Sequence, residues 1–283
     1  MKATFKRDRI LGAFQMAAMV APTRSPKPIL QNVKLVVDET SGQLFATDSE
    51  VSLRVGFEES DVTAPGSCIL PVTRFGAILR ESTDESLSLD TDGNHIAIKS
   101  ARSRFKLPAG NPDEFPDTAE FRESKYHLVS SRLLRELIRR TFFATDAESS
   151  RYALGGVWVE FGKDSIIAVG TVGRRLARLE GEARSIDGHE SSAESTTIVP
   201  ARAMQLIERA MPDDETEVKL AASANELKVE TSHFTLVARL VEGRFPKWQD
   251  VLVERPETKR IQISVGPLYH AVRQAAIVTS EES

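Results

Sequence analysis

The side chains that could support catalysis or bind a metal are few in this chain, and they lie far apart in the sequence. None of the histidines belongs to an HExxH or HxxxH pattern, and none is paired closely with a carboxylate as a zinc or general-base site requires. The five are His95, His127, His189, His233 and His270. We therefore expect no metal-ligand set and no metal-dependent catalysis.

The glycine patterns of acyl transfer and phosphate binding are also missing. The sequence has no G-x-S-x-G, no G-x-x-x-x-G-K-[ST] and no G-x-G-x-x-G, and "GTVGRRL" lacks the third glycine and the acidic partner of a dinucleotide fingerprint. We expect no catalytic residues and no cofactor. The alternative of a hydrolase would depend on Ser130, His127 and Asp146, the nearest polar trio, but their spacing has no nucleophile-elbow context.

The single cysteine, Cys68, lies in the apolar segment "SCILP". One cysteine can form neither an internal disulfide nor a CxxC metal site. Its apolar neighbours favour a buried structural thiol, so redox chemistry is not expected.

Composition indicates a globular protein. The chain has 283 residues, of which 41% are hydrophobic and 28% are charged, enough for roughly two domains with cores of their own. No run of about 18 apolar residues occurs, and "MKATFKRDRI" leads into an amphipathic stretch, so we expect a cytoplasmic protein with no membrane partner. The net charge of −4 argues against a surface that binds nucleic acid uniformly.

Several segments occur twice at a nearly constant separation. Phe115-Pro116 and Phe245-Pro246 lie 130 residues apart, and Pro71 in "CILPVTRFGAILRES" lies 129 residues before Pro200 in "TIVPARAMQLIERAM". The helical pattern of 6–21 recurs at 130–145, and a third copy starts at 263–278. A unit of about 130 residues is much longer than a solenoid repeat, so each unit is expected to fold around its own core.

Each full unit is predicted to contain a helix, alternating strands, a second helix and a hairpin that leads to the Phe-Pro pair. Asp92-Gly93 is a turn signal for the hairpin of the first unit. Polar segments place the boundaries near residues 123 and 258, which gives units 1–123 and 124–258 and an incomplete unit 259–283. The polar stretch 182–196 is interpreted as a loop inside the second unit.

Cations concentrate on the four predicted helices of these two units, while acidic residues gather in loops and at strand ends. A single helix with such charges would be an ordinary solvated face. If the repeat places all four on one surface, they form a basic stripe suited to sequence-independent phosphate contacts. The cations are Lys6, Arg7, Arg9, Arg74, Arg80, Arg132, Arg135, Arg139, Arg140, Arg202 and Arg209.

A set of longer motifs runs through the whole chain in a fixed order: "PILQNVKL", "RSRF", "EFPD", "RYALGGVWVEF", "GTVGRRLA", "IVPARA", "LVEGRFPKWQDVL" and "AAIVTSEE". In order and approximate spacing they resemble the bacterial DNA polymerase III β subunit, the ring-shaped sliding clamp. The resemblance implies an α+β fold of repeated clamp domains, with helices on one face and antiparallel sheets on the other. It also implies a non-catalytic processivity factor whose two subunits join head to tail around duplex DNA.

The resemblance matches two residues to DNA contacts, Arg24 in "TRSPKPIL" and Tyr152 in "SSRYAL". Taken singly, Arg24 also fits a solvated loop cation, and Tyr152 a packed turn residue. From the predicted helices we add Arg74, Arg135, Arg139 and Arg202 as candidate phosphate contacts. The expected DNA partner is double-stranded and is bound without sequence preference, which would place the protein at the nucleoid.

The resemblance also implies a hydrophobic groove in the second domain that receives short motifs of the polymerase III α subunit, the clamp loader and other replication and repair proteins. An apolar wall with a few polar markers suits such anchoring. From the sequence alone, core packing is the better explanation of Leu154, Leu176 and Val251, and only the resemblance makes them groove residues. The carried-over groove residues are Leu154, Thr171, Gly173, Arg174, Arg175, Leu176, Pro246, Asp250 and Val251. Ile78 and Phe105 would supply the first-domain face of the subunit interface.

Three groove positions depart from the family pattern. Val172 replaces an acid, Arg174 replaces a histidine, and Asp250 stands where a basic residue is common, which implies a different peptide preference. The last strands of the third domain would follow Ser283, so the chain as written is not expected to close the complete ring. The alternative function is therefore a monomeric, clamp-derived module that binds replication proteins.

Overall fold

The computed structural model describes residues 1–58, 60–118, 120–146, 154–192, 196–212, 214–252, 259 and 261–279. The chain divides into two compact units, Met1–Pro246 and Lys247–Ser283. The larger unit contains all of the β-sheet structure of the described residues. The smaller one contains the 3-10 helix η5 (Trp248–Val251) and the helix α5 (Val265–Ala276).

The larger unit begins with one strand–helix series, which we call the first repeat. Its elements are β1 (Lys2–Lys6), α1 (Arg7–Ala18), η1 (Pro28–Gln31), β2 (Asn32–Val37), β3 (Gly42–Thr47), β4 (Val51–Phe57), β5 (Ser60–Ala64), β6 (Gly66–Pro71), α2 (Val72–Glu81), β7 (Ser86–Thr91), β8 (His95–Lys99), β9 (Arg104–Pro108) and η2 (Pro112–Glu114).

The same series then follows again, and we call it the second repeat. Its elements are β10 (Tyr126–Ser130), α3 (Ser131–Thr141), η3 (Phe142–Ala144), β11 (Gly156–Phe161), β12 (Ser165–Thr171), β13 (Leu176–Glu182), β14 (Arg184–Ile186), β15 (Ile198–Pro200), α4 (Ala201–Ala210), β16 (Glu217–Ala222), β17 (Glu226–Glu230) and β18 (Phe234–Arg239).

Strand order shows that the two repeats have the same topology. The first forms β5-β1-β7-β8-β9 and β4-β3-β2-β6, and the second forms β14-β10-β16-β17-β18 and β13-β12-β11-β15. One strand of each repeat joins the two: β18 pairs antiparallel with β4, from Phe234 opposite Val55 to Ala238 opposite Val51. This junction produces a continuous nine-stranded sheet. The duplicated sequence is therefore a duplicated fold, as the repeat predicted.

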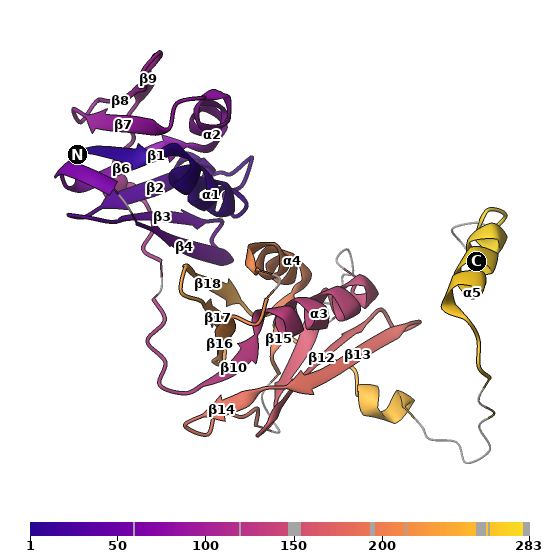
Figure 1. Ribbon diagram of the computed structural model, residues 1–283. Helices are drawn as coiled ribbons and strands as arrows, with labels where there is room; N and C mark the ends of the chain where they lie inside the picture. Colours follow the sequence, from indigo (N-terminus) through magenta and orange to yellow (C-terminus); the bar gives the residue numbers. More distant parts are fainter. Residues whose placement is uncertain are drawn as a thin grey trace. The chain divides into compact units, whose positions relative to one another are not determined.

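Alternating apolar positions explain the layers. In β2, Val33, Leu35 and Val37 are buried and the residues between them are partly exposed, the period of a strand with one face on a core. In α1, Ile10, Phe14 and Ala17 are buried at helical spacing. The ring of Phe14 meets that of Phe75 from α2 edge to face, with centroids 4.9 Å apart. Figure 1 shows the two helices next to each other beside the sheets of the first repeat.

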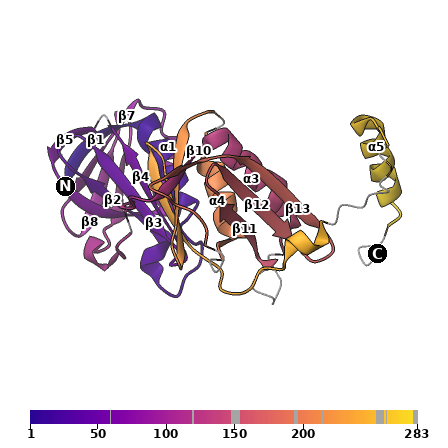
Figure 2. The same ribbon diagram turned by 90° about the horizontal axis from the view of Figure 1, so that it is seen from below.

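The second repeat is built in the same way. Its helices α3 and α4 contact each other, and they pack on β12 and β13 and on β11, respectively (Figure 2). Ser130 caps α3, because its hydroxyl oxygen accepts a hydrogen bond from the backbone N–H of Leu133 at 3.2 Å. The helices predicted at 6–21, 130–145 and 263–278 are thus confirmed as α1, α3 and α5.

One sequence prediction is wrong in part. The stretch 182–196 was expected to be a loop, but Arg184–Ile186 form the strand β14, in which Ile186 pairs with Tyr126 and Arg184 with Leu128 of β10. A short edge strand is held by backbone hydrogen bonds, so it requires no apolar pattern and gives little signal in the sequence.

Cys68 is buried, as its apolar neighbours indicated, at 2% exposure. Loss of solvation raises the pKa of its thiol to about 12. The thiol is therefore protonated at neutral pH and has a structural role.

Within the described residues, no helix has the length and apolar content needed to cross a membrane, and no three His, Cys, Asp or Glu side chains gather as metal ligands.

Candidate functional site

The outer face of α3 carries four arginines. Leu134, Leu137 and Ile138 turn toward the core, so helical spacing directs the arginines away from it. Arg132, Arg139 and Arg140 have side chains that are 59%, 54% and 65% exposed, whereas Arg135 is 17% exposed. This face is cationic, as the sequence indicated, but acidic residues accompany it.

Each arginine of α3 lies near a carboxylate. Arg132 pairs with Glu215 at 2.8 Å, and Arg140 pairs with Glu136 one helical turn earlier. Glu208 of α4 approaches two arginines at once: Arg139 Nε donates to its Oε1 at 2.7 Å, and Arg135 Nη2 lies 3.6 Å from the same oxygen. Sequence reasoning missed Glu208, because it stands 69 residues from Arg139 and no local pattern links them.

Arg202 of α4 reaches the first repeat. Its Nη2 lies 2.9 Å from Asp48 Oδ2 and donates to the carbonyl of Val20 at 3.4 Å, near the end of α1. The side chain of Asp48 is only 8% exposed, and its Oδ1 accepts from the backbone N–H groups of Glu50 and Val51 at 2.9 and 2.7 Å. Arg202 is therefore an inter-repeat contact, while 53% of its side chain remains exposed.

The remaining candidate DNA contacts come from the first repeat and from a segment outside the description. Arg24 is exposed between α1 and η1, and Arg74 is exposed in the first turn of α2. Tyr152 lies outside the described residues. The structure thus brings Arg135, Arg139 and Arg202 to the α3–α4 layer, and it places Arg74 on the equivalent pair of helices in the first repeat.

Further ion pairs fasten the junction of the repeats around the β4–β18 pairing. Arg54 of β4 donates to Glu120 Oε1 at 2.9 Å, and Lys228 of β17 pairs with Glu123 at 2.6 Å. Hydrogen bonds from Arg122 and from Arg54 lower the pKa of Glu120, so this carboxylate stays charged. These ion pairs hold the segment that connects the two repeats against the strands β4 and β17. No pattern in the sequence had indicated these contacts.

The candidate groove is centred on the turn between β12 and β13. Thr171 is 5% exposed, its hydroxyl donates to the carbonyl of Arg175 at 2.9 Å, and its Oγ1 accepts from the N–H of Gly173 at 3.0 Å. Gly173 has φ +83°, a conformation that side chains disfavour, and a Cβ there would meet nothing within 4 Å. The turn is thus held internally, and Arg174 and Arg175 are exposed on it.

Two neighbouring segments add apolar surface to this turn. The guanidinium of Arg175 lies 6.0 Å from the ring centroid of Phe143, which is 53% exposed, an arrangement that orients the cation over the ring. The carbonyl of Leu154 accepts a hydrogen bond from the backbone N–H of Asp146 at 2.8 Å, so Leu154 is tied to the chain just after Phe143. Leu154 is 9% exposed and Leu176 is partly buried. Phe143 was not among the sequence candidates.

The other groove candidates are divided between the two compact units. Phe245 stacks on Trp158 of β11 with centroids 6.1 Å apart, which positions the exposed Pro246 at the end of the larger unit. Asp250 and Val251 belong to η5 of the smaller unit, where both are exposed. The structure therefore brings together the groove residues that belong to the second repeat, and it assigns Asp250 and Val251 to the smaller unit.

The interface candidates lie on different elements of the first repeat. Ile78 of α2 is 9% exposed, and Phe105 of β9 is 39% exposed. Phe105 faces Ile98 of β8 in the sheet register. Among the described strands, β9 pairs only with β8, so the other edge of β9 carries unpaired backbone groups (Figure 1).

The hydrolase trio does not assemble. His127 uses both ring nitrogens elsewhere: Nδ1 lies 2.7 Å from Nδ1 of His189, and Nε2 lies 2.7 Å from the carbonyl of Gly162. Ser130 caps α3 instead of contacting this imidazole. Burial is the main cause that lowers the pKa of both histidines, and His127 lowers that of His189 further. The pair is a neutral structural contact.

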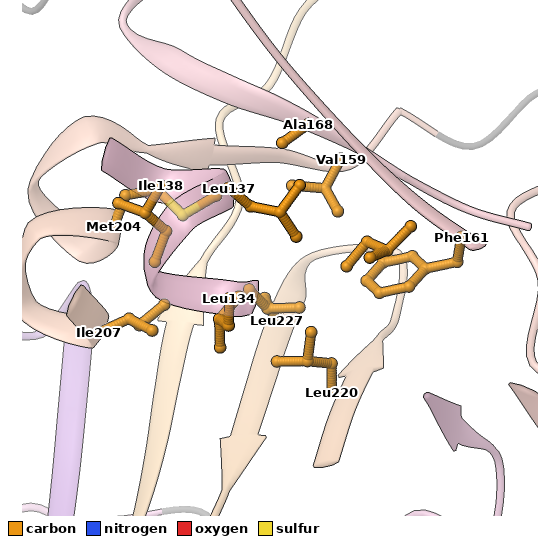
Figure 3. A pocket seen from close by; sticks show the side chains of 11 residues that line it. Leu134, Leu137, Ile138, Val159, Phe161, Ala168, Met204, Ile207, Leu220 and Leu227 are labelled. Carbon is orange, nitrogen blue, oxygen red and sulfur yellow. The ribbon is translucent and has the colours of Figure 1, made fainter. Parts of the chain in front are cut away.

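An enclosed cavity in the second repeat is too small for a ligand. Its volume is about 20 Å³, the space of about one water molecule, and apolar side chains of α3, α4 and the facing strands surround it (Figure 3). The lining residues are Leu134, Leu137, Ile138, Val159, Phe161, Ile166, Ala168, Met204, Ile207, Leu220 and Leu227. We interpret it as a packing gap in the core.

Comparisons with known proteins agree on one family. A family model described as the N-terminal domain of the DNA polymerase III beta subunit matches residues 1–119, and one described as its central domain matches residues 128–247. The curated beta sliding clamp of Pseudomonas putida is 30% identical over 287 residues, which cover 100% of this chain and 76% of that protein. The beta sliding clamp of Pseudomonas aeruginosa is 29% identical, with the same coverage.

Solved structures give the same result. The crystal structure of a DnaN sliding clamp, the DNA polymerase III subunit beta, from Pseudomonas aeruginosa bound to griselimycin has a TM-score of 0.89 and 27% identity, covering 99% of this chain and 75% of that one. A C. crescentus beta sliding clamp has a TM-score of 0.88 and 27% identity, covering 100% of this chain and 76% of that one. The α+β clamp fold expected from the sequence is confirmed.

Proposed function

Because this chain belongs to the family of DNA polymerase III beta subunits and is a DNA sliding clamp without catalytic activity, we propose that it acts in a closed ring around duplex DNA. The observation that carries this proposal is the pairing of β18 with β4, which joins two equivalent repeats head to tail in one sheet. The equivalents of these two strands are β9 in the first repeat and β13 in the second.

Both equivalent strands have one unpaired edge among the described strands. A further strand of the β18 type would complete the edge of β13, and one of the β4 type would complete the edge of β9. Repetition of the same head-to-tail contact generates a ring when its rotation closes. We propose residues 1–123 and 124–258 as two clamp domains, 259–283 as the start of a third, and a homodimeric ring with Ile78 and Phe105 at the subunit interface.

In this ring the helices α1 to α4 would face the DNA. Arginines on their surface contact phosphates, which carry no sequence information, so the protein holds duplex DNA without reading bases. Such contacts weaken with salt because binding releases counterions. The proposed contacts are Arg24, Arg74, Arg135, Arg139, Arg202 and Tyr152.

The second repeat would also bind partner proteins. The apolar side chains near the β12–β13 turn, together with the aromatic ring of Phe143 under Arg175, suit a short peptide with hydrophobic anchors. We propose that the polymerase III α subunit, the clamp loader and other proteins with such motifs bind here, at the nucleoid in the cytoplasm. The proposed groove residues are Leu154, Thr171, Gly173, Arg174, Arg175, Leu176, Pro246, Asp250 and Val251.

Topological linkage is the test of the ring. The protein encoded by the full reading frame is loaded onto nicked circular duplex DNA, and its retention at moderate salt is measured before and after the circle is linearised. Release on linearisation is the expected result, since a ring leaves through a free DNA end. Equal retention on circular and linear DNA, or none on either, contradicts the proposal.

A further inference from the structure

The α3–α4 layer contains an acidic side chain between two of the arginines proposed to meet DNA. Glu208 Oε1 accepts a hydrogen bond from Arg139 Nε at 2.7 Å, and Arg135 Nη2 lies 3.6 Å away. The side chain of Glu208 is 21% exposed, compared with 64% for Glu215 and 44% for Glu136, which pair with other arginines of α3. Glu208 is thus the most enclosed of these carboxylates.

This arrangement limits what Arg139 can do. Its side chain is 54% exposed, so a phosphate could approach it, but its guanidinium already donates to a carboxylate. An arginine must weaken such an ion pair before it binds a phosphate with the same donor group. Because α4 packs against α3, the carboxylate of Glu208 stays beside Arg139, in the same α3–α4 layer.

We propose that Glu208 weakens the protein's hold on DNA by competing with phosphates for Arg139. Glu208 is then a positioning residue that acts through Arg139 and does not touch DNA itself. The inference rests on the proposed function, in which this layer faces the duplex. A protein that slides must break each phosphate contact as it forms the next, so a carboxylate that shares the arginine lowers the cost of every step.

The test compares Glu208→Gln with a matched control, Glu180→Gln. Glu180 pairs with Arg178 on β13, so both substitutions remove one negative charge from an ion pair with an arginine. Glu180 is exposed and alternates with Leu179, which packs on the core, so it lies on the strand face opposite that core. Affinity for a short fluorescein-labelled duplex is measured by anisotropy over a range of salt concentrations, and circular dichroism verifies the fold of each variant.

We expect E208Q to bind the duplex roughly twofold to fivefold more tightly at low salt, the range expected for one exposed charge contact. The slope of log affinity against log salt should steepen by about 0.9, the value for one additional phosphate neutralised. E180Q should change neither quantity. In an Arg139→Gln background, E208Q should lose most of its effect, as a double-mutant cycle requires for a coupled pair.

An equal gain from E180Q, which would reflect net charge alone, overturns the inference, and so does a gain from E208Q that persists without Arg139. If the unaltered protein binds the duplex and E208Q binds no more tightly, the inference fails and the proposed function stands. If the unaltered protein does not bind the duplex at low salt, the proposed DNA-facing layer fails, and this inference fails with it.

Discussion

Nδ1 of His127 and Nδ1 of His189 lie 2.7 Å apart in the core of the second repeat, and their neighbours define a single arrangement of protons. The N–H of Ala222 donates to Nε2 of His189 at 3.2 Å, so that imidazole carries its proton on Nδ1 and donates it to His127. His127 then carries its proton on Nε2 and donates to the carbonyl of Gly162. Both rings are neutral, and an added proton would face another donor.

The first prediction concerns acid stability. Both pKa values are lowered from 6.5 in the folded protein, chiefly by burial, so the unfolded chain binds protons first as the pH falls. The histidine contribution to the free energy of unfolding should therefore be complete above about pH 6.5 and decrease below it. Urea unfolding at pH 7.5 and pH 5.5 measures the loss.

Two charged side chains near the pair also affect the pKa values of the histidines. The charge of Glu190 raises the pKa of His127 and so opposes the effect of burial. The charge of Lys125 lowers the pKa of His189 and so adds to the effect of burial. His189→Gln should reduce the pH dependence of the free energy of unfolding. An identical pH dependence in H189Q and in the unaltered protein would contradict the assignment.

The second prediction concerns the junction between the repeats. Arg202→Gln leaves the nearly buried carboxylate of Asp48 without its cation and should lower the free energy of unfolding by about 1–2 kcal/mol, less than for a fully buried pair because Arg202 is half exposed. The Asp48→Asn variant completes a double-mutant cycle. Additive effects in that cycle would show that the two side chains are not coupled.

The third prediction concerns the cavity in the second repeat. Leu134 is 5% exposed and lines the gap, so Leu134→Ala should enlarge an existing void and cost about 2–5 kcal/mol of stability. The matched variant Leu252→Ala, at a residue that is 53% exposed, should change stability by less than about 0.5 kcal/mol. Both are measured by urea denaturation, and similar values for the two would contradict the packing described here.

The fourth prediction concerns the proposed groove. Phe143→Ala removes the exposed ring beneath Arg175 and should weaken binding of a fluorescent peptide from the polymerase III α subunit by roughly fivefold or more, the loss expected of a contact worth over about 1 kcal/mol. Phe121→Ala serves as the control, because this partly buried ring packs against Tyr126 of β10 in the nine-stranded sheet, whereas the β12–β13 turn belongs to the four-stranded sheet. Equal affinities of F143A and the unaltered protein would remove Phe143 from the groove.

Local sequence patterns predicted much of this fold. Leu134, Leu137 and Ile138 recur at the helical period in α3, and Val33, Leu35 and Val37 at the strand period in β2, because a helix or strand that packs on a core must repeat its buried face at its own period. The spacing of the Phe-Pro pairs likewise indicated the duplication. The helix and strand periods lie within short segments, and the duplication follows from comparing the sequence with itself, so both can be recognised without knowledge of how the segments meet.

Only the tertiary structure decided which charged groups meet. Arg135, Arg139 and Arg202 were identified as cations on helices, yet their acidic neighbours Glu208 and Asp48 follow from the packing of α3 on α4 and of β18 beside β4. His127 and His189 meet across 62 residues for the same reason. Such contacts depend on which distant segments the fold brings together. The periodicity of one helix or strand does not indicate which other segment it will contact.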